Sequence, residues 1–365
     1  MKKLLAMLLA LAMVLALVAC GGGAADDGGA GEDAGTADGG EDSGAKIGEG
    51  RTLVVGIWGA EQETLVREHI IPVFEEQTGA TVELILGGTG DRYAKLYAEV
   101  DAPTMDVMYL NHAQTQQATA DGMILPPDPE AVTNYDKLYD LAKVGDGYGV
   151  ALIATGLMYS TEEFDEAPTS WSVCFEDEYH GRVAPFVFPG SQGQAFLIMA
   201  AKTFGGDEHN IDPGFEAIAG LKPYPLIGDG IDQINQAFLD GDVVLAPQIS
   251  GYVYSAQDQG IPVDFCIPEE GAVLALNCAV IPKNTANADL AKIWIDLHLG
   301  QECQQGYAEM LYYGPTNSEV VLSDDLAGKV IYGEEDVAGL YIPDNAHLTA
   351  VQDEWVERWN TEILS

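Results

Sequence analysis

The chain has 365 residues, with 16 Lys and Arg against 58 Asp and Glu, and a formal net charge of −42. This charge argues against nucleic-acid binding, which needs clustered Lys and Arg, and against electrostatic attachment to an anionic lipid surface. The length and the 47% hydrophobic content predict about two domains with sizeable cores.

The first twenty residues have the pattern of an export signal. Lys2 and Lys3 precede an uncharged apolar run over 4–19, which is short for a transmembrane helix of ~20 apolar residues. The run ends in Leu17-Val18-Ala19-Cys20, which resembles the lipobox of bacterial lipoproteins. The resemblance implies a signal peptide over 1–19, and a lipid on Cys20 that anchors the chain to the outer face of a bacterial cell membrane. An ordinary signal peptide with an incidental cysteine is the alternative.

A Gly- and Asp-rich segment follows, and we expect residues 20–50 to form an acylated, flexible tether. Residues 51–365 still contain 13 basic and 50 acidic residues, a net charge of −37. The acidity therefore belongs to the folded body. A solvated acidic surface is the favoured explanation, and an acidic ligand pocket is the alternative.

Cysteines remain at four positions in the body: Cys174, Cys266, Cys278 and Cys303. An exported chain can form disulfides, and Cys266 with Cys278 is the pair that we favour because these residues flank a turn-rich stretch. The sequence leaves open whether any disulfide forms. No C-x-x-C spacing is present, so we expect no metal cluster.

The body alternates predicted strands and helices. Its predicted strands cover 53–58, 81–86, 106–110, 148–158, 243–246 and 273–281. Its predicted helices cover 61–77, 92–100, 115–121, 194–204, 231–239, 287–299, 301–311 and 351–364. Gly79 and Gly122 follow two of these helices, as C-terminal glycines do. The initial β-α-β-α-β-α order predicts an α/β fold with a mostly parallel sheet covered on both faces.

Ligands of open α/β sheets bind beyond the carboxyl ends of the strands. Three loops follow such ends here: 58–61, 87–91 and 111–112. The second loop, Gly87-Gly88-Thr89-Gly90-Asp91, opens a predicted helix, and its N–H groups could hold a carboxylate or a phosphate. A tight turn with no ligand is the alternative.

Enzyme signatures are missing from the sequence. It contains no G-x-S-x-G, H-E-x-x-H or Walker A motif, and its six His have no ligand-like spacing. A hydrolase would need a nucleophile with a base, or converging metal ligands, and no such set is visible. We therefore expect a protein that is not an enzyme and holds no metal or cofactor.

Several short blocks of sequence follow one another between residues 51 and 320. They are LVVGIW at 53–58, TSW with EYHGRV at 169–171 and 178–183, QGIPVDF with PEEG at 259–265 and 268–271, IPKN at 281–284, and YGPTN at 313–317. In this order they resemble the type II extracellular solute-binding proteins of ABC importers, nearest the spermidine/putrescine-binding branch.

The resemblance implies a two-lobed periplasmic-binding-protein-like fold, in which a hinge joins two lobes that each have a mostly parallel sheet flanked by helices. Lobe 1 would cover 51–154 plus 276–320, and lobe 2 would cover 155–275 plus 321–365. The crossing segments would lie near 154–156 and 276–277. A small solute would bind between the lobes, which would close by bending. The closed monomer would deliver the solute to the importer permease.

The resemblance also implies site residues. Trp58 would stack on the ligand, where an amine gains ~0.5–2 kcal/mol from a cation–π contact. Ser191, Gln194 and Asn277 lie where polyamine binders carry acids, and Ala275 replaces an aromatic residue. The predicted ligand-binding set is Trp58, Glu61, Thr89, Asn111, His112, Ser191, Gln194, Tyr252, Asn277 and Tyr313. For Trp58 and Tyr313, packing in the core is the alternative.

The identity of the ligand stays open. A polyamine or related small amine is favoured, although only Glu61 remains as a nearby anion to offset its charge. The helix that begins at 190–194 suits an anion, so a carboxylate, phosphonate or sugar phosphate is the second alternative. Iron, with Tyr252 and Tyr254 as candidate ligands that a strand would point the same way, or thiamine is the third. A ligand-sensing lipoprotein that is not coupled to transport is the alternative class.

Overall fold

The computed structural model describes residues 46–365, and residues 45–365 form one compact unit. The predicted signal, Cys20 and most of the predicted tether lie outside the described residues. The end of that tether contacts the body, because Gly48 is buried and its N–H donates to the Thr78 carbonyl at 2.8 Å. Within residues 46–365, no helix combines the length and the apolar character needed to cross a membrane.

All the named strands of the described residues belong to one mixed sheet. They are β1 (Thr52–Ile57), β2 (Thr81–Leu86), β3 (Val107–Asn111), β4 (Lys143–Val144), β5 (Gly147–Ser160), β6 (Leu245–Ile249), β7 (Val263–Cys266), β8 (Ala272–Val280) and β9 (Leu340–Tyr341). The order is β2-β1-β3-β8-β5-β4, with β6 and β7 on β5 and with β9 on β8. β1 is parallel to β2 and β3, whereas β8 runs antiparallel to β3 and β5. The sheet is therefore mixed, where the sequence predicted a mostly parallel one.

Helices cover the sheet on both sides of this path. The α-helices are α1 (Glu61–His69), α2 (Ile71–Thr78), α3 (Thr89–Ala98), α4 (His112–Ala120), α5 (Ser191–Thr203), α6 (Asp212–Gly220), α7 (Ile231–Leu239), α8 (Ser250–Asp258), α9 (Ala288–His298), α10 (Gln301–Leu311), α11 (Asp324–Ala327), α12 (Gly333–Ala338) and α13 (Asn345–Arg358). Short 3₁₀ helices lie at Tyr135–Lys137, Asp140–Ala142, Trp171–Phe175 and Asp177–Tyr179, and a π-helical turn, Trp359–Ile363, follows α13.

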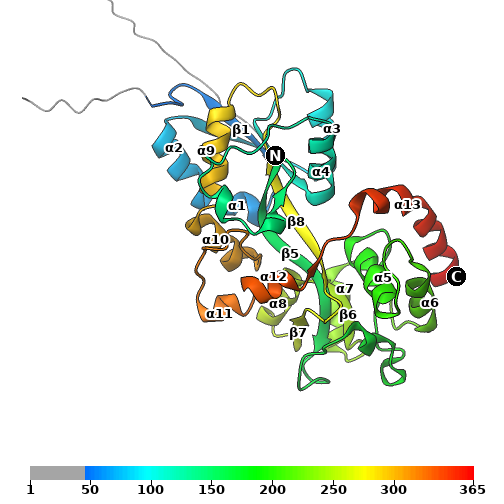
Figure 1. The fold of residues 1–365 in the computed structure, drawn as a ribbon. Coiled ribbons are helices and arrows are strands. Elements are labelled where there is room, and N and C mark those ends of the chain that lie inside the picture. Colours follow the sequence, from blue (N-terminus) through cyan, green and yellow to red (C-terminus); the bar gives the residue numbers. More distant parts are fainter. Residues whose placement is uncertain (1–45) are drawn as a thin grey trace, which may run out of the picture. The chain divides into compact units, whose positions relative to one another are not determined.

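The first half of the unit is built on β1, β2 and β3. Helices α1, α2, α9 and α10 pack around these strands, and α3 and α4 lie beside them (Figure 1). Leu53, Val55 and Ile57 alternate along β1 and are fully buried. Phe74 of α2 meets Trp294 of α9 edge to face, with ring centroids 5.7 Å apart. This core holds the carboxyl ends of the three parallel strands in fixed positions.

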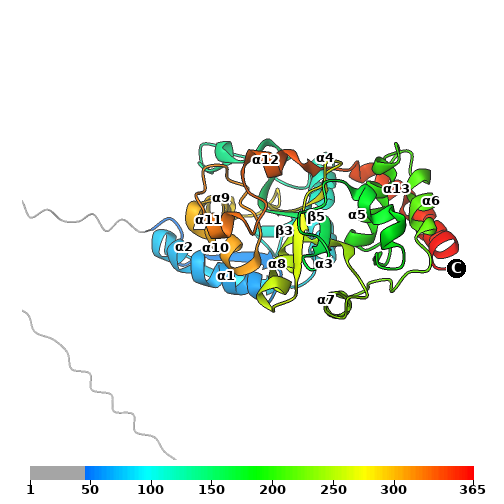
Figure 2. The ribbon, with the colours of Figure 1, turned by 90° about the horizontal axis from the view of Figure 1, so that it is seen from below.

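The second half has its own core around α5, α6, β6 and the C-terminal helix α13. Figure 2 shows α5, α6 and α13 together, away from α1, α2 and α10. Trp171, Phe196 and Phe215 are fully buried there, and the π-helical turn adds Trp359, whose ring stacks on Phe188 with centroids 5.7 Å apart. The C-terminal segment thus completes this core.

β5 and β8 run through both halves (Figure 1). β5 pairs with β8 as far as Thr155, where pairing with β6 begins. β8 pairs with β3 only from Asn277 onward. Both changes of partner fall within the segments that the sequence marks as crossings, and a third connection, in which Gly314 and Leu152 exchange two hydrogen bonds of 2.8 Å, lies beside them.

Several predicted elements differ from the structure. The helix predicted over 61–77 is broken at Ile70 into α1 and α2, because Pro72 in the first turn of α2 has no N–H for a continuous helix. Helix α8 occupies a stretch that includes Tyr252 and Tyr254, for which the sequence predicted no helix. Helix α6 and strand β7 were not predicted.

The favoured Cys266–Cys278 disulfide is wrong. All four described cysteines are free, and Cys174, Cys278 and Cys303 are buried. Along β5, Cys266 pairs with Leu157, whereas Cys278 pairs with Gly149. These positions are eight residues apart on one strand, or about 26 Å. A disulfide requires Cα atoms within about 7 Å.

Candidate functional site

The ends of the parallel strands bring several predicted site residues to one edge of the sheet. Trp58 follows β1, Thr89 begins α3 after β2, Asn111 ends β3, and His112 begins α4. Asn277 of β8 is the direct partner of Asn111 across the β3–β8 ladder. Because neighbouring parallel strands end at the same edge, these five residues share the position at which open α/β sheets bind ligands.

Trp58 is held by a row of aromatic rings. Its ring lies 6.0 Å from Tyr109, which lies 5.2 Å from His298. Tyr307 is 5.1 Å beyond His298 and stacks on Tyr313 at 6.2 Å. Trp58 and Tyr313 therefore stand at the two ends of one row that runs through the core of the first half.

A second group of predicted residues meets around Tyr313. Burial, together with the nearby Tyr252 and Glu61, raises the pKa of Tyr313 to about 12. Any side chain at Gly251 would meet the Tyr313 ring at 3.1 Å, so α8 begins directly against Tyr313. Glu61 is exposed at the start of α1. Residues from α1, α8 and the segment after α10 therefore converge here.

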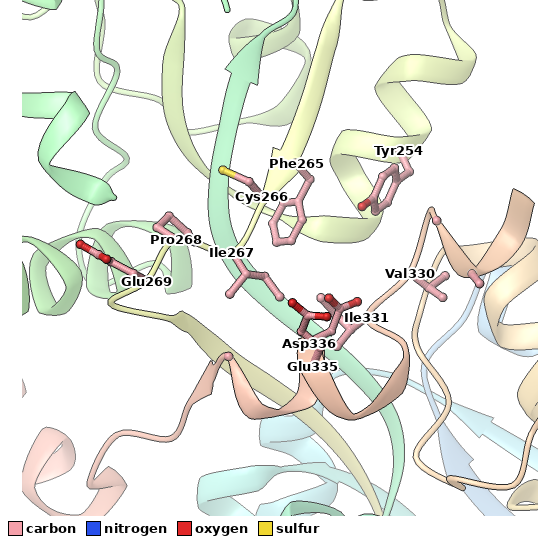
Figure 3. Close-up of a pocket in the computed structure, with 13 residues that line it drawn as sticks. Tyr254, Phe265, Cys266, Ile267, Pro268, Glu269, Val330, Ile331, Glu335 and Asp336 are labelled. Atoms are coloured by element: carbon pink, nitrogen blue, oxygen red, sulfur yellow. The ribbon is translucent and has the colours of Figure 1, made fainter. Parts of the chain in front are cut away.

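Tyr252 and Tyr254 do not form a pair of metal ligands. They lie in helix α8, in which residues two apart point to nearly opposite sides, whereas a strand would point both the same way. Tyr252 lies near Tyr313, whereas Tyr254 lines a different cavity of about 530 Å³ (Figure 3). Within residues 46–365, no group of three His, Cys, Asp or Glu side chains is placed to hold a metal.

The cavity of Figure 3 lies between β7, α8 and the segment that contains α12. Phe265, Ile267 and Ile331 give it an apolar lining, and Glu335 and Asp336 bring carboxylates to it. Burial raises the pKa of Asp336. None of the predicted ligand-binding residues lines this cavity.

Ser191 and Gln194 lie in the first turn of α5, in the second half. The neighbouring Gln192 donates from Nε2 to Oε1 of Gln248 at 3.1 Å. Gln248 lies near the end of β6, four residues before Tyr252 of α8. Among the described residues, Ser191 and Gln194 make no hydrogen bond with the strand-end residues. The first turn of α5 is therefore joined to β6 through Gln192 and Gln248.

Asn111 and His112 already have partners. Asn111 Oδ1 accepts a hydrogen bond from the Gln114 N–H at 2.8 Å, which makes it the N-terminal cap of α4. The His112 ring Nδ1 lies 3.3 Å from Nδ2 of Asn345 at the start of α13, and burial lowers the pKa of His112. Both side chains therefore also stabilise the fold.

Arg92 stands at the same sheet edge, although the sequence analysis did not single it out. It is 2% exposed, and its Nε donates to the Tyr109 carbonyl at 2.7 Å. Its Cζ lies 4.7 Å from the centre of the Trp58 ring. The helical spacing of the sequence could have revealed Arg92. It lies four residues before the buried Leu96 and so occupies the apolar face of α3.

This architecture, in which two α/β halves are joined by long strands, is that of type II periplasmic binding proteins. The chain belongs to the bacterial extracellular solute-binding protein family, whose model matches residues 70–333. It is thus an extracellular solute-binding protein of the ABC transporter class and not an enzyme. The fold class and the family expected from the sequence are confirmed.

Individual relatives agree with this assignment. The chain is 28% identical over 259 residues to a putrescine/cadaverine-binding protein from Pseudomonas aeruginosa, covering 64% of this chain and 72% of the relative. The crystal structure of an ABC transporter from Clostridium perfringens has a TM-score of 0.75 and 26% identity, over 85% of this chain and 99% of that one. An extracellular solute-binding protein from Bordetella parapertussis shares the fold, with a TM-score of 0.77 and 21% identity over 86% and 98%.

Proposed function

We propose that the chain captures a small amine-bearing solute, a polyamine or related small amine, between its two halves and delivers it to the permease of an ABC importer. The observation that carries this proposal is that α8, which contains Tyr252, begins directly against Tyr313, with Glu61 nearby. A carboxylate beside aromatic rings is a suitable environment for an ammonium group. The binding of putrescine and cadaverine by a relative supports the same solute class.

Closure around the solute would use the two strands that connect the halves. β5 and β8 change partners at Thr155 and Asn277. Bending at these positions therefore leaves most of the strand pairing within each half intact. The closed state gains stability only from contacts that the solute makes with both halves at once. Tyr252 and Tyr313 would supply such contacts from opposite sides.

The same proposal includes attachment to the outer face of the membrane through a lipid on Cys20, and action as a monomer. Each buried CH₂ of an acyl chain contributes ~0.8 kcal/mol to membrane attachment, so two or more chains hold a protein firmly. Labelling of the expressed protein with a radioactive fatty acid tests this point. Incorporation should be lost in Cys20→Ser, and incorporation that persists in this variant would contradict the anchor.

A thermal-shift screen tests the binding function. The panel is diamines, polyamines, amino acids, phosphonates, sugar phosphates and ferric citrate, and a bound solute should raise the melting midpoint. Trp58→Ala should weaken affinity about 3- to 30-fold, which corresponds to the loss of one aromatic contact to an amine. Phe204→Ala, an exposed aromatic residue after α5, is the control and should bind normally. Equal affinity of Trp58→Ala and the unaltered protein would contradict the role of Trp58.

A further inference from the structure

Arg92 carries a positive charge that forms no ion pair within residues 46–365. Its side chain is buried, and among residues 46–365 no carboxylate oxygen lies within 4 Å of its guanidinium. Nε and Nη1 donate to the carbonyls of Tyr109 and Gly87, but Nη2 has no hydrogen-bond partner in the described part of the chain. Buried polar groups are nearly always paired, and a buried unpaired charge is costly.

The unpaired guanidinium lies at the start of α3. Gly88 caps this ten-residue helix without a side-chain hydrogen bond, so the first N–H groups of the helix are also free to donate. A hollow of about 410 Å³ opens there, and its lining includes Gly87, Gly88 and Arg92 together with one acidic and one further basic residue, Asp91 and Lys95. Two independent features at one place, a buried cation and a helix N-terminus, therefore both suit an anion.

The position of Arg92 connects this anion site with the proposed solute site. Its guanidinium lies over Trp58, and it is fixed to the carbonyl of Tyr109, two residues before Asn111. An ammonium group held on the same indole ring would stand within about 10 Å of the guanidinium. Like charges this close in a desolvated site repel, so one end of the site disfavours a diamine.

We infer that Arg92 binds a carboxylate of the solute, so that the solute is a linear amino carboxylate rather than a diamine. This inference rests on the proposed function, because it assigns the two ends of the same site. Glu61, which lies near Tyr313, takes the ammonium end. Arg92 and the first N–H groups of α3 take the carboxylate end.

Calorimetric titration of the purified protein with matched probes tests the inference. The probe pairs are 4-aminobutanoate with 1,4-diaminobutane, and 5-aminopentanoate with 1,5-diaminopentane. In each pair a single terminal group changes from carboxylate to ammonium. The amino carboxylate should bind at least about tenfold more tightly than its partner, as expected for a charge-assisted pair with arginine.

Arg92→Met should reverse this preference, because it removes the carboxylate partner and also the repulsion of the second ammonium. Affinity for the amino carboxylate should fall about tenfold or more, and affinity for the diamine should rise. Arg92→Lys should retain part of the preference, because it keeps the charge without the planar fork. The control is Arg67→Met, which removes an equal charge from the exposed face of α1 and should leave both affinities unchanged.

The ratio of the two affinities separates ligand contact from a structural role. A merely structural Arg92 would weaken both probes alike in Arg92→Met, and that result would overturn the inference. Tighter binding of the diamine to the unaltered protein would also overturn it, while leaving the proposed function standing. Binding of neither probe would contradict both. A melting shift produced by inorganic phosphate, lost in Arg92→Met and independent of both probes, would show a separate anion site and overturn the inference.

Discussion

His298 is a titratable side chain in the middle of the aromatic row that supports Trp58. It is fully buried and shares a hydrogen bond between its Nδ1 and the Tyr109 hydroxyl, while its Nε2 has no partner among the described residues. Burial lowers the pKa of His298 to about 3. In the unfolded chain the pKa of this ring is about 6.5, so the ring begins to bind a proton near that pH. The folded protein keeps the ring neutral under the same conditions.

Stability should consequently fall as the pH drops below about 6.5. In the window from 6.5 to 3 the unfolded state binds a proton at His298 that the folded state does not, so the free energy of unfolding decreases with falling pH. Between pH 7.5 and pH 5 this single group removes about 2 kcal/mol. Urea unfolding at these two pH values, for the unaltered protein and for His298→Gln, measures the difference.

Comparing the two proteins separates the contribution of His298 to the pH dependence of stability from that of the many carboxylates. His298→Gln should be less stable at pH 7.5 but should lose about 2 kcal/mol less on acidification. His180→Gln, at an exposed position, should follow the unaltered protein. An identical pH dependence for His298→Gln and the unaltered protein would refute the assignment of a neutral buried ring.

At the residue scale, the sequence could indicate only those site residues whose place follows from chain position. Trp58, Thr89 and Asn111 directly follow apolar strands, so their place at the sheet edge follows from the strand pattern. Arg92 could not be found in this way. Its burial depends on Gly56, whose missing side chain leaves room for the Arg92 stem and the Met105 sulfur. That contact joins separate parts of the chain and exists only in three dimensions.

At the scale of the element, β5 depends on close backbone packing where its partners change. A side-chain carbon at Gly156 would lie 2.6 Å from the Phe265 ring and 2.7 Å from the Cys266 carbonyl. Gly156→Ala should therefore reduce the free energy of unfolding by about 1–3 kcal/mol, the usual cost of overpacking. Denaturant unfolding measures this loss directly.

Gly220→Ala is the matched control for this change. Gly220 ends helix α6, and a side-chain carbon there meets nothing within 4 Å. Alanine should be neutral or stabilise the helix by up to about 1 kcal/mol. If Gly156→Ala is as stable as Gly220→Ala, β5 tolerates a side chain at this point and the close contact is wrong.

Strand positions were the most predictable elements, because short apolar runs between turns are local signals. β1, β2, β5 and β8 lie within a few residues of their predicted ranges. Strand direction was not predictable, since whether β8 runs parallel or antiparallel depends on a return from the second half. Helix α8, which contains Tyr252 and Tyr254, was not predicted, and it begins against Tyr313, a contact between separate parts of the chain.

At the scale of the whole molecule, self-repulsion should make stability depend on salt. Residues 51–365 carry a net charge of −37, and a large like charge destabilises the compact state. Raising NaCl from about 0.05 to about 0.5 M shortens the screening distance from about 14 Å to about 4 Å. The melting midpoint should rise over this range at pH 7.5, and it should rise less at pH 4, where carboxylates are partly protonated. A midpoint that falls with added salt would contradict this expectation.

Capture of a solute by closure of the two halves is the central claim, and small-angle X-ray scattering tests it most directly. The radius of gyration is measured without solute and with a saturating amount of the tightest-binding probe found by calorimetry. The radius of gyration should be smaller with the solute, and it should not decrease for Trp58→Ala at a solute concentration too low to saturate this variant. An unchanged radius of gyration at full saturation would contradict closure about β5 and β8.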